Sequence, residues 1–169
     1  RGDSNAKTTL GDYYNTLGLK YFSSNEEQNV EKSIYCFEES NKLNDENGRK
    51  NLGILYNQIG VNYYNGKDNY SIDYNKAEDY FKKAFELGNE NAKKNLGVLY
   101  IQYGKQYRDG DNAKINHELA ENFFKKSIEL GNEEAKYKLV KDYTNCYFNY
   151  RYGVNGYLKD IDKANQMLT

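Results

Sequence analysis

The stretch Leu52-Gly53-Ile54-Leu55-Tyr56 decides the fold of this chain, because related stretches recur at a nearly constant distance from it. Leu96-Gly97-Val98-Leu99-Tyr100 lies 44 residues later, and Leu139-Val140-Lys141-Asp142-Tyr143 lies another 43 residues on. Leu10-Gly11-Asp12-Tyr13-Tyr14 lies 42 residues before the first stretch. A fixed period of a few dozen residues is the signature of a repeat architecture. The 169-residue chain is therefore predicted to contain four copies of one structural unit.

A second set of residues follows the same period independently. Each repeat carries one small residue, with spacings of 44, 43 and 44, at Ser33, Ala77, Ala120 and Ala164. A phenylalanine follows four residues later in the first three repeats, at Phe37, Phe81 and Phe124. The apolar residues around each small residue share one stripe of a helix. In the second repeat this stripe is formed by Ala77, Tyr80, Phe81, Ala84 and Leu87. That spacing predicts an amphipathic helix as the second element of each repeat.

Polar residues mark where these second helices begin and end. Each start is predicted at a side chain that can accept hydrogen bonds from first-turn amides, namely Asn29, Asp73, Asn116 and Asp160. Each end is predicted at a residue that tolerates the left-handed conformation, namely Asn44, Gly88 and Gly131. The next helix is opened directly by Asp45, Asn89 and Asn132. Because this turn is tight, consecutive helices are expected to pack antiparallel.

The first helices of the first three repeats each carry two glycines seven residues apart. The pairs are Gly11 and Gly18, Gly53 and Gly60, and Gly97 and Gly104. A glycine costs about 1 kcal/mol in a helix interior, so these positions predict a neighbouring helix too close for a β-carbon. Val140 and Tyr147 replace both glycines in the fourth repeat, where we expect looser packing. The first helices are predicted to end at Ser24-Asn25, Asn65-Gly66, Asp109-Gly110 and Tyr152-Gly153.

These patterns predict an all-α fold, an α-solenoid of about four antiparallel helix-hairpin repeats with a period of about 43 residues. We expect a single repeat domain over residues 1–169. Its repeats are placed at approximately 7–44, 45–88, 89–131 and 132–169. The in-phase tyrosines are interpreted as packing residues between repeats, at Tyr14, Tyr56, Tyr100 and Tyr143.

Three motifs of the second repeat carry a family resemblance. They are Ile59-Gly60-Val61-Asn62-Tyr63, Asp73-Tyr74-Asn75-Lys76-Ala77 and Lys83-Ala84-Phe85-Glu86-Leu87-Gly88-Asn89. With them the chain resembles the Sel-one-like repeat family, which is related to the tetratricopeptide repeat. The chain departs from that pattern in a seven-residue extension of each first helix and in its degraded fourth repeat. The resemblance implies an adaptor or scaffold, and bacterial members of the family often act in secretion or host interaction.

Composition and charge exclude several classes of function. With 24 basic and 25 acidic residues the formal net charge is −1, so we expect no nucleic-acid partner. No apolar run approaches the roughly 20 residues needed to cross a bilayer, which predicts no membrane span. Met167 is the only methionine, so we expect the chain to be processed or cut from a longer polypeptide.

Catalytic and metal-binding patterns are missing from the sequence. His117, the only histidine, follows Asn116 at a helix start and is interpreted as a solvated first-turn residue. Cys36 and Cys146 lie 110 positions apart, match no zinc-ligand spacing and are interpreted as ordinary thiols. The glycines match no phosphate-binding loop. The sequence therefore predicts no enzyme, no cofactor and no metal site.

The leading hypothesis for function is a non-enzymatic protein–protein interaction scaffold that binds a peptide or partner protein on its concave face. The candidate contact residues lie beside the packing stripe of the first helices: Asn15, Asn57, Gln58, Asn62, Gln102, Lys105 and Arg108. The alternative is a surface module that binds a glycan or another ligand. We also expect the C-terminal end, with Ile161, Ala164 and Leu168 on an apolar stripe, to meet further repeats or to self-associate.

Overall fold

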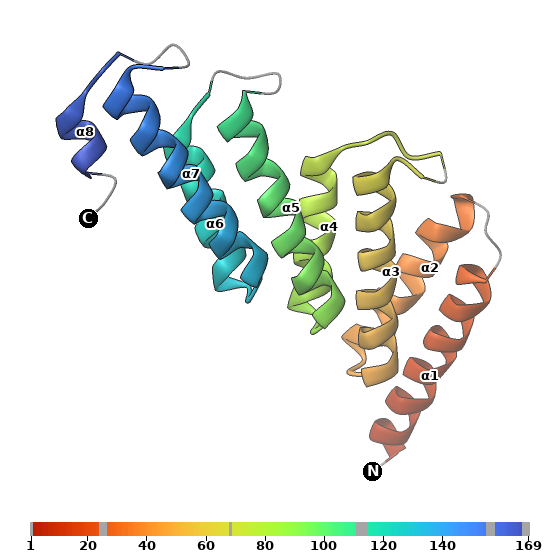
Figure 1. Ribbon diagram of the computed structural model, residues 1–169. Coiled ribbons are helices and arrows are strands. Elements are labelled where there is room, and N and C mark those ends of the chain that lie inside the picture. The colour runs from red at the N-terminus through yellow and green to blue at the C-terminus, as the bar shows by residue number, and fades with distance from the viewer. Residues whose placement is uncertain (1, 24–26, 68, 111–114, 155–157, 167–169) are drawn as a thin grey trace. The chain divides into compact units, whose positions relative to one another are not determined.

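The computed structural model describes residues 2–23, 27–67, 69–110, 115–154 and 158–166, and Figure 1 displays their helices. Eight helices and no strand occur within these ranges, which confirms the predicted all-α repeat fold. The chain divides into two compact units, Arg1–Lys93 and Lys94–Thr169. The first unit holds α1 (Gly2–Phe22), α2 (Glu27–Lys42), α3 (Glu46–Asn65), α4 (Tyr74–Glu86) and the start of α5 (Glu90–Asp109). The second holds the rest of α5, α6 (His117–Glu129), α7 (Glu133–Tyr152) and α8 (Ile161–Gln166).

The first unit stacks helices in two layers. Helix α1 packs on α2, α2 on α3 and α3 on α4, while α1 also contacts α3 directly. The first helices of the two hairpins are therefore neighbours, with α2 packed against both. The core between them is built from fully or almost fully buried side chains: Phe37, Leu52, Leu55, Tyr56, Ile59, Ala84 and Ala92.

The second unit is packed in the same manner. Helix α6 packs on α7 and α7 on α8. Its core joins Ile101 of α5, Ala120 and Phe124 of α6, and Ala135 of α7. Leu139, which corresponds to the buried Leu52 of the first unit, is only partly buried against this core. The single-domain assignment over 1–169 and the repeat boundaries stay predictions.

The predicted caps explain where most helices begin and end. Asp73, Asn116 and Asp160 each accept a hydrogen bond from the amide three residues later, at 2.9–3.0 Å. Asn44, Gly88 and Gly131 have φ values of 64°, 87° and 85°, as the predicted left-handed stops require. Helices α3, α5 and α7 end directly before Gly66, Gly110 and Gly153, which are also left-handed. The predicted stop at Ser24-Asn25 lies outside the described residues.

One predicted helix start was wrong. Helix α2 begins at Glu27, so Asn29 lies inside its first turn instead of capping it. Glutamate and glutamine are strong helix formers, so the sequence at positions 27 and 28 extends the helix upstream. The period located the helix correctly but placed its first residue too late.

The glycine pairs sit where helices approach closely, as predicted. A β-carbon at Gly18, Gly60 or Gly104 would lie 2.5–2.6 Å from the ring of Phe37, Phe81 or Phe124, respectively. At the other glycine of each pair the nearest atoms are farther, at 3.1–3.4 Å. The periodic phenylalanine of each hairpin therefore packs against the second glycine of the pair. None of the described helices combines the length and the apolar character that a membrane span requires.

Candidate interaction surface

The predicted contact residues of the first unit lie on α1 and α3 and bond partly to one another. Asn51 Nδ2 donates to Asn15 Oδ1 at 2.8 Å, which ties α3 to α1 across the layer of first helices. Gln58 Nε2 donates to Asn62 Oδ1 at 3.0 Å within α3. Gln58 is exposed, Asn15 and Asn57 are half-buried, and Asn62 is buried. Asn62 therefore supports Gln58 and is not itself accessible to a partner.

The other three predicted residues lie on α5 in the second unit. Gln102, Lys105 and Arg108 are half-buried and follow one another at three-residue steps. The Arg108 guanidinium forms a two-point ion pair with Asp109, with distances of 2.6 and 2.7 Å. Its hydrogen bond to Asp109 raises the pKa of Arg108 and lowers the pKa of Asp109. Arg108 is thus engaged within the chain, whereas Gln102 and Lys105 border the solvent.

Two exposed apolar residues on the first helices were missed by the sequence analysis. Ile54 on α3 is 50% exposed and Val98 on α5 is 46% exposed. They occupy the same position of the Leu-Gly-x-Leu-Tyr stretch, where the other two repeats have Asp12 and Lys141. Because both apolar and charged residues occur at this position, the sequence could have indicated that it lies at the surface. One turn later stand Gln58 and Gln102, so each helix presents an aliphatic residue beside an amide.

The tyrosines pack mainly within a hairpin and only partly between hairpins. Tyr80 of α4 contacts Tyr56 and Tyr63 of α3, both at 5.8 Å between ring centroids. The Tyr56 hydroxyl also donates to Glu38 Oε1 of the preceding hairpin at 2.7 Å. Burial and this bond raise the pKa of Tyr56. In the second unit Phe123 takes the place of Tyr80 and contacts Tyr100, Tyr103 and Tyr107 at 5.0–6.0 Å.

A groove of about 460 Å³ opens in the first unit between the second helices α2 and α4. Tyr56 and Leu52 of α3 form part of its lining, and five charged or amide side chains of α2 and α4 form most of the rest: Glu38, Asn41, Lys42, Lys83 and Glu86. Lys83 also lies over the rings of Tyr56 and Tyr80. None of the seven predicted contact residues lines this groove, so it is a separate candidate site.

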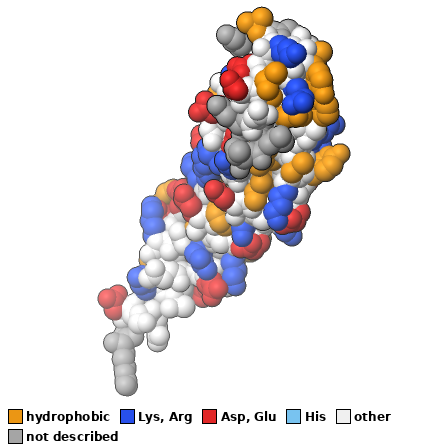
Figure 2. All heavy atoms as spheres, turned by 60° about the vertical axis from the view of Figure 1, so that its left-hand side comes forward, with side chains coloured by type: hydrophobic (Ala, Val, Ile, Leu, Met, Phe, Trp, Pro, Cys, Tyr) orange, Lys and Arg blue, Asp and Glu red, His pale blue; other side chains and the backbone are white. Residues whose placement is uncertain are grey.

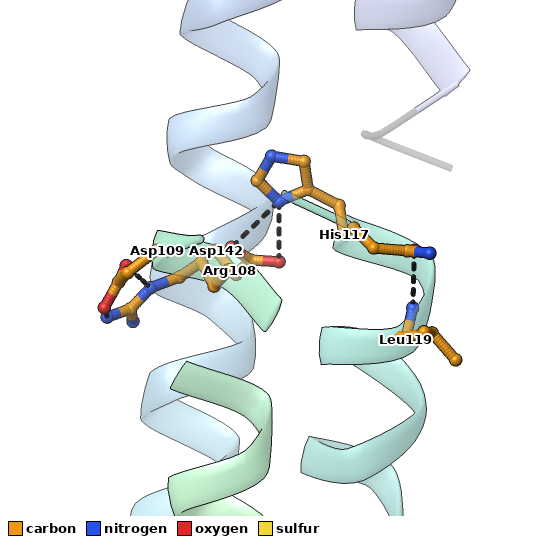
Figure 3. A network of polar contacts seen from close by, with 6 residues as sticks. Arg108, Asp109, His117, Leu119 and Asp142 are labelled. Carbon is orange, nitrogen blue, oxygen red and sulfur yellow. Dashed lines mark hydrogen bonds and ion pairs between the residues drawn. The ribbon is translucent and has the colours of Figure 1, made fainter. Parts of the chain in front are cut away.

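His117 is not the solvated residue that its place after a helix cap suggested. Its side chain is only 21% exposed, and Nδ1 lies 3.2 and 3.4 Å from the two carboxylate oxygens of Asp142 on α7. Figure 3 shows the imidazole turned toward Asp142, with Arg108 turned toward Asp109. Asp142 is 2% exposed, so the contact with His117 lies against a buried carboxylate. Sequence reasoning missed the pair because its members lie 25 residues apart on different helices.

Cys146 completes this group one turn along α7. Among the described residues, His117, Asp142 and Cys146 are the one set of potential metal ligands whose donor atoms lie within 4.8 Å of one another. Burial, and the nearby Asp142 carboxylate, raise the pKa of the Cys146 thiol to about 12. The other free cysteine, Cys36, is buried in the first unit.

The described surface is mixed in charge and apolar in places. Figure 2 shows basic and acidic side chains interspersed over the visible face, with hydrophobic side chains gathered toward its upper end. Large apolar residues are exposed on α7 and beyond it: Tyr137, Val140, Phe148, Tyr152, Val154, Leu158 and Ile161. Of the predicted C-terminal stripe, Ala164 is fully buried, and Leu168 lies outside the described residues. Self-association stays a prediction.

Three solved bacterial structures are similar to this chain. A Sel1 repeat protein from Oxalobacter formigenes is 21% identical over 93% of this chain and 55% of its own, with a TM-score of 0.29. Helicobacter pylori cysteine rich protein B is 24% identical over 78% of this chain and 93% of its own, with a TM-score of 0.30. The Escherichia coli protective antigen c5321 is 17% identical over 96% of this chain and 45% of its own, with a TM-score of 0.29.

The chain thus spans about half the length of the Oxalobacter and Escherichia coli proteins. A comparison with curated proteins found no match. The family model of the Sel1 repeat matches residues 10–45, 53–89, 93–132 and 148–169, which together make up most of the sequence. The chain therefore belongs to the Sel1 repeat family.

Proposed function

We propose that this chain is a non-enzymatic scaffold that binds a protein or peptide through the exposed faces of its first helices, on the concave side of the solenoid. Sel1 repeat proteins generally mediate protein–protein interaction and are typically non-catalytic. First helices line the inner wall of such solenoids, where an extended segment or a helix of a partner finds a continuous surface.

The observation that carries this proposal is the repeated pairing of an aliphatic residue with an amide. Ile54 and Gln58 on α3, and Val98 and Gln102 on α5, stand one helical turn apart. An exposed aliphatic side chain gains free energy when a partner covers it, at roughly 25 cal/mol per Å². A neighbouring amide adds hydrogen bonds that fix the direction of a peptide backbone. Lys105 supplies a positive charge on α5 for an acidic group of the partner.

A second candidate uses the groove between α2 and α4. Its size falls within the range of small-molecule sites, and Glu38, Asn41 and Lys83 offer polar groups to a glycan or another polar ligand. This candidate places the ligand on the opposite layer of helices, so variants of the two layers separate the two functions.

The test is a selection from a random peptide library on the immobilised chain, followed by affinity measurements with the enriched peptides by fluorescence anisotropy. The variant Asn57→Ala, Gln102→Ala, Lys105→Ala is expected to bind at least about tenfold more weakly, which corresponds to 1.4 kcal/mol. The matched groove variant, Asn41→Ala with Lys83→Ala, is expected to bind like the parent. A selection that enriches no peptide, or a loss confined to the groove variant, would refute the first-helix surface.

A further inference from the structure

The group of His117, Asp142 and Cys146 replaces apolar residues of the repeat. The residues 87 positions earlier are Val30, Leu55 and Ile59. In the first unit, Leu55 and Ile59 belong to the hydrophobic core and Val30 packs against it. The α6–α7 contact of the second unit therefore has a nitrogen, an oxygen and a sulfur donor where the α2–α3 contact has only hydrocarbon.

This exchange is costly unless something compensates it. Asp142 is 2% exposed at a position where the first unit buries Leu55 at the same 2%. An isolated ionised carboxylate in such a place is strongly destabilising, so it needs a cation or several hydrogen bonds. Arg108 is close enough for its charge to interact with Asp142, but its guanidinium donates hydrogen bonds to Asp109 through Nε and Nη2. His117 is the direct partner of the buried carboxylate.

We propose that His117, Asp142 and Cys146 form a binding site for one divalent transition-metal ion of the zinc class. Histidine nitrogen, carboxylate oxygen and cysteine sulfur are the three donor types that Zn²⁺ takes in proteins. Tetrahedral ligation at 2.0–2.3 Å places two donor atoms about 3.4 Å apart. The Nδ1 to Oδ1 separation is 3.2 Å, and the thiol lies inside the 4.8 Å that contains all three donors.

The mixed donor set also selects the metal. Mg²⁺ and Ca²⁺ prefer oxygen ligands alone, whereas a set containing imidazole and thiolate favours Zn²⁺, Co²⁺ or Cu²⁺. The partial exposure of His117 gives an ion a route from solvent, and three protein ligands leave the fourth position to water. When the ion binds, Cys146 becomes a thiolate, and its proton passes to the solvent.

Co²⁺ is the probe, because it reports both thiolate ligation and tetrahedral geometry by absorption. The full chain, freed of metal with a chelator, is titrated with Co²⁺ and then with Zn²⁺. We expect one Co²⁺ per chain, with thiolate charge-transfer absorption in the near ultraviolet and intense d–d bands in the visible, all abolished by stoichiometric Zn²⁺. A chain that gives no such absorption does not contain this site.

The variants use residues that the repeat itself supplies. Asp142→Leu and His117→Val restore the residues found 87 positions earlier and are expected to remove the visible bands while circular dichroism stays helical. Cys146→Ser is expected to remove the charge-transfer absorption, and the matched control Cys36→Ser to keep the full spectrum. His117 is partly exposed at the start of α6, so His117→Val is expected to fold. This variant therefore tests the metal site even if Asp142→Leu does not fold. Retention of the tetrahedral Co²⁺ spectrum in either folded variant would overturn the proposal.

Discussion

Ser127 on α6 donates a hydrogen bond of 2.6 Å to the carbonyl oxygen of Gly97 on α5. The first hairpin repeats this bond, because Ser40 on α2 donates to the Gly11 carbonyl on α1 at 2.9 Å. Both hydroxyls are buried, and a helical carbonyl accepts them because glycine leaves the space beside it open. The absence of a side chain at Gly97 therefore has two uses, since it admits a neighbouring helix and exposes an acceptor.

Substitution of Gly97 by valine is predicted to destabilise the fold. A β-carbon there would meet the Asn132 side chain at 3.2–3.3 Å, and Asn132 caps α7 by accepting from the Glu134 amide. Valine adds two methyl groups to this contact, and overpacking of this kind costs about 1–3 kcal/mol. Urea unfolding followed by circular dichroism measures the change. Ser127→Ala is the milder control, because Ala84 holds the equivalent place in the second hairpin.

The two glycines of α3 are predicted to respond differently to alanine. At Gly60 the new β-carbon would lie 2.6 Å from the Phe81 ring, a distance that forces the ring or the helix to move. At Gly53 the nearest atoms are 3.4–3.6 Å away, in ordinary contact. Gly60→Ala is expected to lower the free energy of unfolding by about 1–3 kcal/mol. Gly53→Ala is expected to be neutral or to gain up to about 1 kcal/mol from helix propensity. Equal midpoints in urea would contradict this distinction.

The helical repeat was largely predictable from sequence, because glycines, caps and small residues act locally. Gly66, Gly110 and Gly153 end their helices by backbone conformation alone, so their neighbours in sequence suffice to predict the stop. Asn29 failed as a cap because the helix-forming residues before it outweigh a favourable capping side chain. The pair of His117 and Asp142 depends on contact between α6 and α7. In the sequence, this pair is indicated only by the alignment of repeats, which places the charged Asp142 at the position of the apolar Leu55.

The stability that the hydrogen bond from Tyr56 to Glu38 contributes is predicted to be lost at alkaline pH. Because burial and this bond raise the pKa of Tyr56, the folded chain holds the phenolic proton more tightly than the unfolded chain. Stability from this group is complete below the unfolded pKa, about 10, and is lost as pH rises toward the raised folded pKa. The expected slope is about 1.4 kcal/mol per pH unit for this one proton. Thermal unfolding at pH 8–11 measures it.

The matched variant for this slope is Tyr56→Phe. At neutral pH it is expected to lose about 1 kcal/mol, the net contribution of one hydrogen bond. Between pH 10 and 11 its melting temperature is expected to fall less steeply than that of the parent, because one titrating tyrosine is gone. Tyr13, which is 59% exposed, provides the control, and Tyr13→Phe is expected to leave the slope unchanged. Identical slopes for the parent and Tyr56→Phe would remove Tyr56 as the cause.

The two members of the His117–Asp142 contact are predicted to respond differently to substitution when metal is removed by a chelator. His117→Ala leaves the buried Asp142 carboxylate without its direct partner, which is expected to cost about 1–3 kcal/mol or more. Asp142→Leu instead restores the apolar residue of Leu55 and is expected to be neutral or stabilising by about 1–4 kcal/mol. Urea unfolding midpoints of the two variants and the parent, measured in the presence of EDTA, give these changes in stability. A larger loss in Asp142→Leu than in His117→Ala would mean that the carboxylate contributes net stability at this site.

The exposed aliphatic residues of the first helices are predicted to contribute to partner binding without contributing to folding. Ile54 and Val98 are about half exposed, so Ile54→Lys and Val98→Lys are each expected to change the free energy of unfolding by no more than about 0.5 kcal/mol. A lysine there places a charge where a partner would cover an aliphatic side chain, which is expected to weaken binding of the selected peptides about tenfold or more. Ile72 is 61% exposed in the loop before α4 and serves as the matched control, because Ile72→Lys removes a similar apolar surface that is part of neither α3 nor α5. Anisotropy titrations of each single variant measure the affinities. Undiminished affinity in both Ile54→Lys and Val98→Lys would move the binding surface away from the first helices.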